Sequence, residues 1–234
     1  MTSVTWLITG SSRGLGFELV RQLLPSPENF IIATCRNPDK AAALQELKDN
    51  AGGKLHLVAL DTNSESSIRN SFEAVKAILN DRGVDYLYNN AGLDVADEAF
   101  SFQYADLLQI LQTNVAGPAL IAEVYLPLVE KSRRKTIINV SSGLGSIGQD
   151  RGPSLASYCI SKSALNMLTY KQAKAKPNIT SIALSPGWVQ TDMGGPDAPL
   201  LPQESVASAL KVVKSLTLKD SGKFLSYDGS ELPW

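Results

Sequence analysis

Short apolar runs that end in glycine or polar residues alternate with longer stretches of helical periodicity, and this alternation restricts the fold more than any other feature. The runs typical of β-strands cover residues 4–9, 30–34, 54–60, 84–88, 136–140, 179–184 and 223–226. Helical patterns cover residues 17–24, 39–49, 64–80, 104–130 and 155–173. Strands that alternate with helices form a parallel sheet with helices on both faces. The sequence therefore predicts an α/β protein with a doubly wound sheet of about seven strands.

No internal repeat, low-complexity tract or long linker divides the 234 residues, so we expect residues 1–234 to form a single domain. The formal net charge is -1 and the basic residues are scattered, which argues against a nucleic-acid partner. No apolar run is long enough to span a bilayer, which argues against a membrane protein. The first strand pattern begins at residue 4 without a preceding secretory signal, and a cytoplasmic location is therefore expected.

The cysteines and the single histidine give no sign of a metal site. Cys35 and Cys159 are far apart in the sequence and lack CxxC spacing, which favours free thiols in a reducing compartment. His56 has no histidine or cysteine cluster nearby, so it is interpreted as an ordinary strand residue. No metal is predicted.

A glycine-rich turn follows the first strand. Gly10, Gly14 and Gly16 have the spacing GxxxGxG and lead into the helical pattern at 17–24. Glycines let the backbone approach a pyrophosphate, and a helix N-terminus supplies unpaired N–H groups. The context predicts a dinucleotide-binding, Rossmann-type domain. The spacing differs from the commoner GxGxxG, and a tight turn without a ligand is the alternative.

The end of the second strand indicates which dinucleotide is bound. Sites that prefer NAD carry an acidic residue at this strand end, where it holds the ribose 2′-hydroxyl. Here the strand ends at Cys35 and Arg36, and Arg13 lies within the glycine-rich turn. Two guanidinium groups without a carboxylate suit a 2′-phosphate. NADP(H) is therefore predicted, with two solvated arginines as the alternative.

Tyr158 and Lys162 are four residues apart, which places them on one face of a helix. A nearby ammonium favours the phenolate, so this pairing predicts a lowered Tyr158 pKa. Such a pair can deliver and recover a proton near neutral pH. A surface tyrosine beside a solvated lysine is the alternative.

Together these motifs resemble those of the short-chain dehydrogenases/reductases over almost the full length of the chain. The matching stretches are Thr9–Gly16 (TGSSRGLG), Asp61, Asn89–Gly92 (NNAG), Asn114, Ser142, Tyr158 with Lys162 (YxxxK), and Pro186-Gly187 followed by Thr191. They stand in the family's order and at predicted strand ends. The stretch ATCRNPDKA and the ending SYDGSELPW resemble the carbonyl-reductase branch that includes sniffer-like and C-factor-like proteins.

The resemblance implies an enzyme that reduces an aldehyde or ketone to the alcohol with NADPH. Tyr158 would be the general acid that protonates the carbonyl oxygen, and Lys162 would hold the nicotinamide ribose while lowering the Tyr158 pKa. Ser142 would donate a hydrogen bond to the same oxygen. Asn114 would bind a water that links Lys162 to solvent.

The resemblance also implies a set of cofactor contacts. Gly10, Gly14 and Gly16 would carry the pyrophosphate, and Asp61 would contact the adenine ring. The full implied set is Gly10, Ser12, Arg13, Gly14, Leu15, Gly16, Arg36, Asp61, Asn90, Ala91, Gly92, Tyr158, Lys162, Pro186, Gly187, Val189 and Thr191.

Two segments depart from the family pattern. Ser142 and Tyr158 are 16 positions apart, a longer interval than is usual, which keeps Ser141 open as an alternative to Ser142. The segment 188–202, where the family has its substrate lid, is short and rich in glycine and proline, which predicts an open, permissive pocket. Phe100, Phe102 and Trp188 are candidates for substrate contacts or for core positions.

Other functions and assemblies stay open at this point. The same fold could sense NADP(H) without chemistry, or could serve an NAD-linked alcohol dehydrogenase. The filled positions Tyr158, Lys162, Ser142 and Asn114 favour an enzyme with a small-molecule carbonyl substrate. Family members pair through the helices at 104–130 and 155–173, which implies a homodimer or homotetramer, although monomers also occur.

Overall fold

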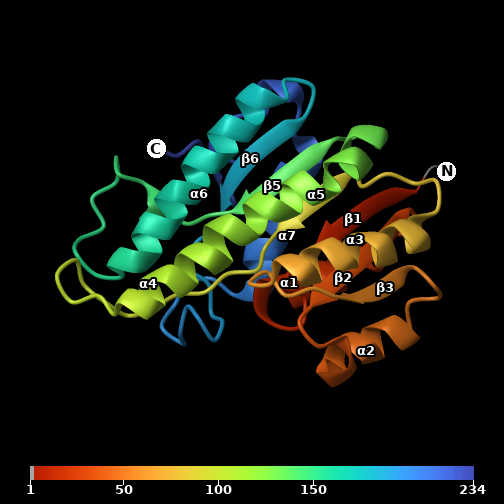
Figure 1. The fold of residues 1–234 in the computed structure, drawn as a ribbon, viewed down its shortest axis with the longest axis horizontal. Helices are drawn as coiled ribbons and strands as arrows, with labels where there is room; N and C mark the ends of the chain where they lie inside the picture. The colour runs from red at the N-terminus through yellow and green to blue at the C-terminus, as the bar shows by residue number, and fades with distance from the viewer. Residues whose placement is uncertain (1–2) are drawn as a thin grey trace.

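One parallel sheet organises the molecule (Figure 1). A computed structural model describes residues 3–234; residues 1 and 2, assigned by the sequence to the same domain, lie outside the described residues. Within residues 3–234 the seven strands have the order β3-β2-β1-β4-β5-β6-β7. They are β1 (Val4–Ile8), β2 (Asn29–Cys35), β3 (Leu55–Ala59), β4 (Tyr86–Asn89), β5 (Thr136–Val140), β6 (Thr180–Ser185) and β7 (Phe224–Ser226). The predicted doubly wound, Rossmann-type sheet is confirmed.

Helices connect the strands and agree with most of the predicted pattern. The α-helices are α1 (Gly14–Leu23), α2 (Ala42–Asp49), α3 (Glu65–Leu79), α4 (Tyr104–Leu111), α5 (Gly117–Lys131), α6 (Ala156–Ala175) and α7 (Pro202–Ser215). Shorter turns are η1 (Pro38–Lys40), η2 (Gln112–Ala116), η3 (Gly143–Gly145) and η4 (Leu218–Asp220).

Two helical features correct the sequence prediction. The helix expected at 104–130 is interrupted by η2, a π-helical turn that separates α4 from α5. Helix α7 has no counterpart among the predicted elements, although Pro202 at its first position is a helix-start signal. Its buried residues Val206, Leu210 and Val213 also have helical spacing.

Helices pack on both faces of the sheet, because successive side chains of a strand point to opposite faces. Trp6 and Ile8 are buried in the cluster that contains residues of α1, α2 and α7. Leu7, between them, belongs to the opposite cluster, which contains residues of α3 and α5. Each face of the sheet thus has its own apolar core, and the polar motifs are left at the ends of the strands.

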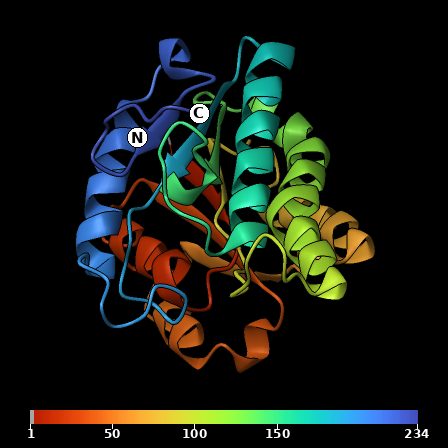
Figure 2. The same ribbon diagram turned by 90° about the vertical axis from the view of Figure 1, so that its left-hand side faces the viewer.

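The strand order reverses between β1 and β4, and ligands of doubly wound sheets bind at such a point. The ends of these two strands are joined by side chains. The Thr9 hydroxyl oxygen accepts hydrogen bonds from the backbone N–H groups of Asn90 (3.0 Å) and Ala91 (3.1 Å), and the Asn90 amide donates to the Thr9 carbonyl (2.9 Å). Figure 2 shows the fold turned so that the loops at this end face the viewer.

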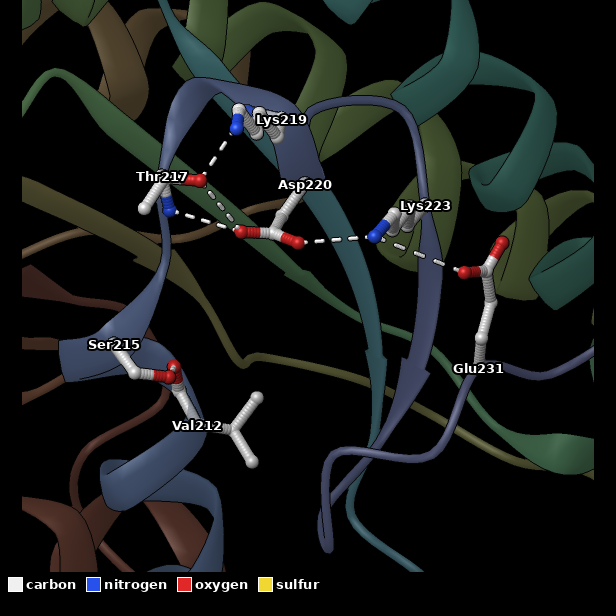
Figure 3. Close-up of polar contacts among 7 residues, drawn as sticks. All are labelled: Val212, Ser215, Thr217, Lys219, Asp220, Lys223 and Glu231. Atoms are coloured by element: carbon white, nitrogen blue, oxygen red, sulfur yellow. Dashed lines mark hydrogen bonds and ion pairs between the residues drawn. The ribbon is translucent and has the colours of Figure 1, made fainter.

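Polar contacts fix the last part of the chain (Figure 3). Thr217 caps η4, because its hydroxyl oxygen accepts from Lys219 N (3.3 Å) while the Asp220 carboxylate accepts from Thr217 N (3.0 Å). Lys223, just before β7, pairs with Asp220 at 3.0 Å and with Glu231 at 3.8 Å. These contacts connect η4, β7 and the final segment.

Candidate active site

A cleft of ≈ 300 Å³ lies at the carboxyl ends of the central strands. Its walls come from the glycine-rich turn, the ends of β2, β3 and β4, helix α6 and the segment after β6. The predicted residues that line it are Gly10, Ser12, Arg13, Gly14, Leu15, Arg36, Asp61, Asn90, Ala91, Gly92, Tyr158, Lys162, Pro186 and Thr191. The structure therefore brings the glycine-rich turn and the Tyr–Lys pair, distant in sequence, into one cleft.

The glycine-rich turn has the geometry of a phosphate-binding loop. Gly10 has φ +67, and a Cβ there would lie 2.9 Å from the Ala91 Cα. Helix α1 begins at Gly14, and no side chain caps its first turn. The leading N–H groups of that helix are thus available to an anion. Gly16 does not line the cleft; a Cβ there would lie 2.3 Å from the Gly10 carbonyl oxygen, so Gly16 serves the packing of the turn.

The cleft is basic at the end of β2, where an NAD-preferring site is acidic. β2 ends at Cys35, and the exposed Arg36 follows it. Arg13 is also exposed and pairs with Asp192 at 2.9 Å. Both arginines line the cleft, and their forked donors fit a 2′-phosphate. Asp61 lies at the end of β3, where its carboxylate accepts from Asn63 N at 3.0 Å.

Tyr158 and Lys162 lie one turn apart on α6 and are both buried, with exposures of 9% and 3%. The Lys162 Nζ lies 5.4 Å from the Tyr158 ring centroid and donates to the Val140 carbonyl oxygen at 2.8 Å. Burial raises the pKa of Tyr158 to about 12 and lowers the pKa of Lys162 to about 8. The predicted lowering of the Tyr158 pKa is therefore wrong in this structure, because burial raises the pKa by more than the nearby Ser142 hydroxyl lowers it.

The paired serines after β5 have different environments. Ser142 lies next to Tyr158, and its hydrogen bond with the phenol acts against the rise in the Tyr158 pKa that burial causes. Its hydroxyl oxygen also accepts from Leu144 N at 3.2 Å. Ser141 is buried, and its hydroxyl donates to the Asn166 side chain of α6 at 2.6 Å. Ser141 lines the cleft and Ser142 does not, but of the two hydroxyls only Ser142 acts on the phenol of Tyr158.

Asn114 lies on the π-helical turn η2 and is fully buried, outside the cleft lining. The oxygen of its side-chain amide accepts a hydrogen bond from Leu93 N at 2.8 Å, and the nitrogen of the same amide donates to Leu93 O at 2.8 Å. The same amide donates to the Ser161 hydroxyl at 2.9 Å, next to Lys162 on α6. Asn114 therefore ties the loop after β4 to the helix that carries the pair. A water held by Asn114 stays a prediction.

The start of α6 is fixed by a carboxylate that sequence reasoning missed. The Asp97 carboxylate accepts hydrogen bonds from Ser157 N at 3.0 Å and from the Ser157 hydroxyl. The main-chain oxygen of Asp97 accepts from Leu155 N at 2.9 Å. An acidic side chain at a helix N-terminus satisfies free N–H groups and interacts favourably with the helix dipole. The turn that carries Tyr158 is thereby held against the loop after β4.

The segment after β6 forms one side of the cleft. Thr191 lines it, and the Thr191 hydroxyl oxygen accepts from Gly194 N at 3.1 Å. Gly187 and Val189 were predicted contacts but do not line the cleft. Gly187 has φ +82 and packs against Leu200, while buried Val189 forms an isolated bridge with the same residue. These two residues shape the segment, and the permissiveness of the pocket stays a prediction.

Sequence reasoning missed several residues that line the cleft, most of them neighbours of predicted ones. They are Cys35, Leu60, Thr62, Asn63, Leu93, Gln109, Thr113, Val140, Asp192 and Met193. For those near strand ends, that position was the available signal, whereas Gln109 and Thr113 lie on α4 and η2 and carried none. Phe100, Phe102 and Trp188 are all exposed, so their core alternative is wrong.

Among residues 3–234, no group of three or more His, Cys, Asp or Glu side chains is placed to hold a metal ion. Over the same range, every helix is too short or too polar to cross a membrane.

Comparisons with known proteins agree with this geometry. A family model described as short chain dehydrogenase matches residues 5–199. An uncharacterized oxidoreductase of Schizosaccharomyces pombe is 30% identical over 262 residues, covering 100% of this chain and 99% of that protein. The C-signal protein of Myxococcus xanthus is 36% identical over 154 residues, covering 64% of this chain and 93% of that protein.

Two solved structures are similar over their full length. The carbonyl reductase Sniffer of D. melanogaster has a TM-score of 0.94 at 34% identity, with 100% of both chains covered. An NADPH-bound carbonyl reductase from chicken fatty liver has the same TM-score of 0.94, the same 34% identity and the same 100% coverage of both chains. With the cleft, the glycine-rich turn and the Tyr–Lys pair in place, the chain belongs to the short-chain dehydrogenase/reductase family.

Proposed function

We propose that this protein reduces an aldehyde or ketone to the corresponding alcohol with NADPH as the hydride donor. The observation that carries the proposal is that Tyr158 and Lys162 line the cleft that continues to the glycine-rich turn, with Ser142 next to Tyr158. Two structures similar to this chain are described as carbonyl reductases, and one of them is bound to NADPH. A sensor of NADP(H) would not need a proton donor at this place.

The chain's own residues would hold the cofactor. Gly10 and Gly14 bring backbone against the pyrophosphate, and the uncapped first turn of α1 donates N–H groups to it. Arg13 and Arg36 bind the 2′-phosphate, so Arg13 exchanges its ion pair with Asp192 for the phosphate. Lys162 donates to the nicotinamide ribose hydroxyls from its place on α6.

The reaction adds a hydride to the carbonyl carbon and a proton to the carbonyl oxygen. NADPH, when bound, supplies the hydride and leaves as NADP⁺. Tyr158 gives its phenolic proton to the oxygen, and the proton is later restored from solvent. The Tyr158 phenol is protonated at neutral pH, as a proton donor must be, and burial, which raises its pKa to about 12, makes it a weaker acid than a phenol in water. The Ser142 hydroxyl donates a hydrogen bond to the same oxygen as negative charge develops there.

The test is a screen of aldehydes, ketones and quinones against NADPH oxidation, repeated with NADH. Tyr158→Phe should lower turnover by about 10²–10⁴ and leave NADPH affinity nearly unchanged. Tyr170→Phe is the matched control, because Tyr170 lies on the exposed side of the same helix. Full activity of Tyr158→Phe would refute the mechanism. NADPH binding without turnover of any carbonyl would indicate a sensor, and equal use of NADH would refute the cofactor assignment.

A further inference from the structure

The last residues of the chain return along the edge of the sheet toward the proposed active site. After β7 the backbone turns, with Gly229 at φ +91 and Ser226 N donating to Ser230 O at 2.8 Å. Leu232 N then donates to Phe224 O at 2.8 Å, so the returning segment pairs with β7. This final stretch, Leu232–Trp234, is called the C-terminal strap below. Figure 2 places the end of the chain beside the loop that joins β5 to α6.

The strap is fixed to the fold by its aromatic ring. The Trp234 ring stacks on Phe224 with a centroid distance of 5.6 Å and an interplanar angle of 19°. Phe224 lies within β7 and is only 1% exposed, so it is a rigid partner. The stacking therefore positions the backbone of Pro233 and Trp234 relative to the sheet.

That backbone binds the middle of the loop after Ser142. The buried Ser146 hydroxyl donates to the Pro233 carbonyl oxygen at 2.6 Å, and Gly148 N donates to the Trp234 main-chain oxygen at 2.8 Å. The contact is close, since a Cβ on Gly148 would lie 3.0 Å from the Pro233 Cβ. Ser146 and Gly148 thus pack with the strap as one unit.

The inner part of the loop is held in another way. The Gly145 carbonyl oxygen accepts from the Ser163 hydroxyl at 2.9 Å and from the Asn166 amide at 3.1 Å, both on α6. Beyond Gly148, the exposed Arg151 side chain forms hydrogen bonds only with nearby Gln149 in the part of the chain that the structure describes. The strap is therefore the anchor of the loop's middle part, between the segment fixed on α6 and the exposed segment.

No residue of the loop 146–152 lines the cleft. We propose that this loop borders the substrate beyond the cleft, and that the C-terminal strap, by positioning the loop, sets substrate affinity with little effect on the cofactor. This rests on the proposed function, because the loop leads directly from Ser142 to the helix of Tyr158. Trp234 and Ser146 are positioning residues in this scheme: they act on substrate through the loop.

The first test compares the KM for the carbonyl substrate with the KM for NADPH. Trp234→Ala and Ser146→Ala should each raise the KM for the carbonyl substrate by about threefold to tenfold, the scale of one net hydrogen bond or aromatic contact. The KM for NADPH should stay within about twofold of wild type. Trp234→Phe keeps a ring against Phe224 and should restore most of the affinity. Glu231→Gln is the matched control, because it removes an ion pair of the same segment that does not contact the loop.

The second test does not depend on activity. Trypsin should cleave after exposed Arg151 about threefold to tenfold faster in Trp234→Ala than in wild type, because the released loop opens more often. Unchanged cleavage and unchanged KM in both Trp234→Ala and Ser146→Ala would overturn the inference. An equal rise in the KM for NADPH would also overturn it, since it would indicate general loss of structure. If wild type reduces no carbonyl, the proposed function fails while the cleavage result still decides the role of the strap.

Discussion

The buried ammonium of Lys162 makes the free energy of unfolding depend on pH, and the substitution Lys162→Met should remove this dependence. Burial lowers the Lys162 pKa from 10.5 to about 8, so the folded protein releases this proton before the unfolded chain does. Between these two pH values the unfolded state holds more protons, and the free energy of unfolding therefore rises with pH. In Lys162→Met the titrating group is absent, and this contribution should vanish.

The magnitude follows from the size of the lowering. A fall from 10.5 to about 8 corresponds to about 3 kcal/mol in total, at about 1.4 kcal/mol per pH unit. About 2 kcal/mol of this rise falls between about pH 7 and about pH 9.5. Urea unfolding of the cofactor-free protein at several pH values in this range gives the free energy of unfolding for each variant. From about pH 7 to about pH 9.5, the free energy of unfolding of wild type should rise by about 2 kcal/mol relative to that of Lys162→Met.

Other groups also titrate in this range, so a control is needed. Lys171→Met removes a lysine from the exposed face of the same helix, and its difference from wild type should stay constant with pH. If the free energies of unfolding of wild type and Lys162→Met also differ by a constant amount at every pH, the reasoning is refuted. In that case the ammonium would be solvated in solution, and the site would be more open than the structure shows.

Three further predictions concern the cofactor loop and the paired serines. Arg36→Asp should weaken NADPH binding by about 1.5–3 kcal/mol while NADH binding changes little, because in the proposed function the guanidinium binds the 2′-phosphate. Equal weakening of both cofactors in a titration would show that Arg36 does not contact the phosphate. Gly10→Ala should destabilise the fold by about 1–3 kcal/mol in thermal unfolding, because its Cβ would lie 2.9 Å from the Ala91 Cα at φ +67. A variant as stable as wild type would contradict this. Ser142→Ala should lower kcat by about 10²–10³, whereas Ser141→Ala should mainly lower the melting temperature; the reverse pattern in kinetics and melting curves would exchange their roles.

The positions of the polar motifs could be predicted from the sequence because of a general property of parallel sheets. Strand carboxyl ends meet at one edge, so Gly10, Asp61 and Asn90 had to lie close together once their strands were recognised. Tyr158 and Lys162 follow on the helix after β5 and reach the same cleft. Local periodicity was sufficient for this part of the site.

Burial could not be predicted in the same way. The spacing of Tyr158 and Lys162 shows that they share a helix face, but it does not show how much water reaches them. That depends on the loop after β4, on η3 and on the end of β5, which are distant in sequence. The predicted sign of the Tyr158 pKa shift was therefore wrong, because desolvation is the largest effect on this phenol.

Asn114 shows a second limit of local reasoning. The residues of η2 contain no proline or glycine, and Gly117 and Pro118, which directly follow η2, did not prevent the interpretation of 104–130 as one helix. The π-helical turn is accompanied by bonds from Asn114 to Leu93 and Ser161, both far away in sequence. Such turns are frequent at functional sites, where tertiary contacts offset the cost of the irregular helix.

Burial costs this site stability and also gives it suitable chemistry. In water, a phenol and an ammonium both keep their protons at neutral pH. In the cleft, Tyr158 holds its proton more firmly while Lys162, with a pKa of about 8, is close to releasing its own. A group whose pKa lies near the operating pH exchanges protons readily. In the proposed mechanism, Lys162 is therefore the group suited to restore the proton of Tyr158 after each reduction, and an exposed lysine at the same spacing would serve this step less well.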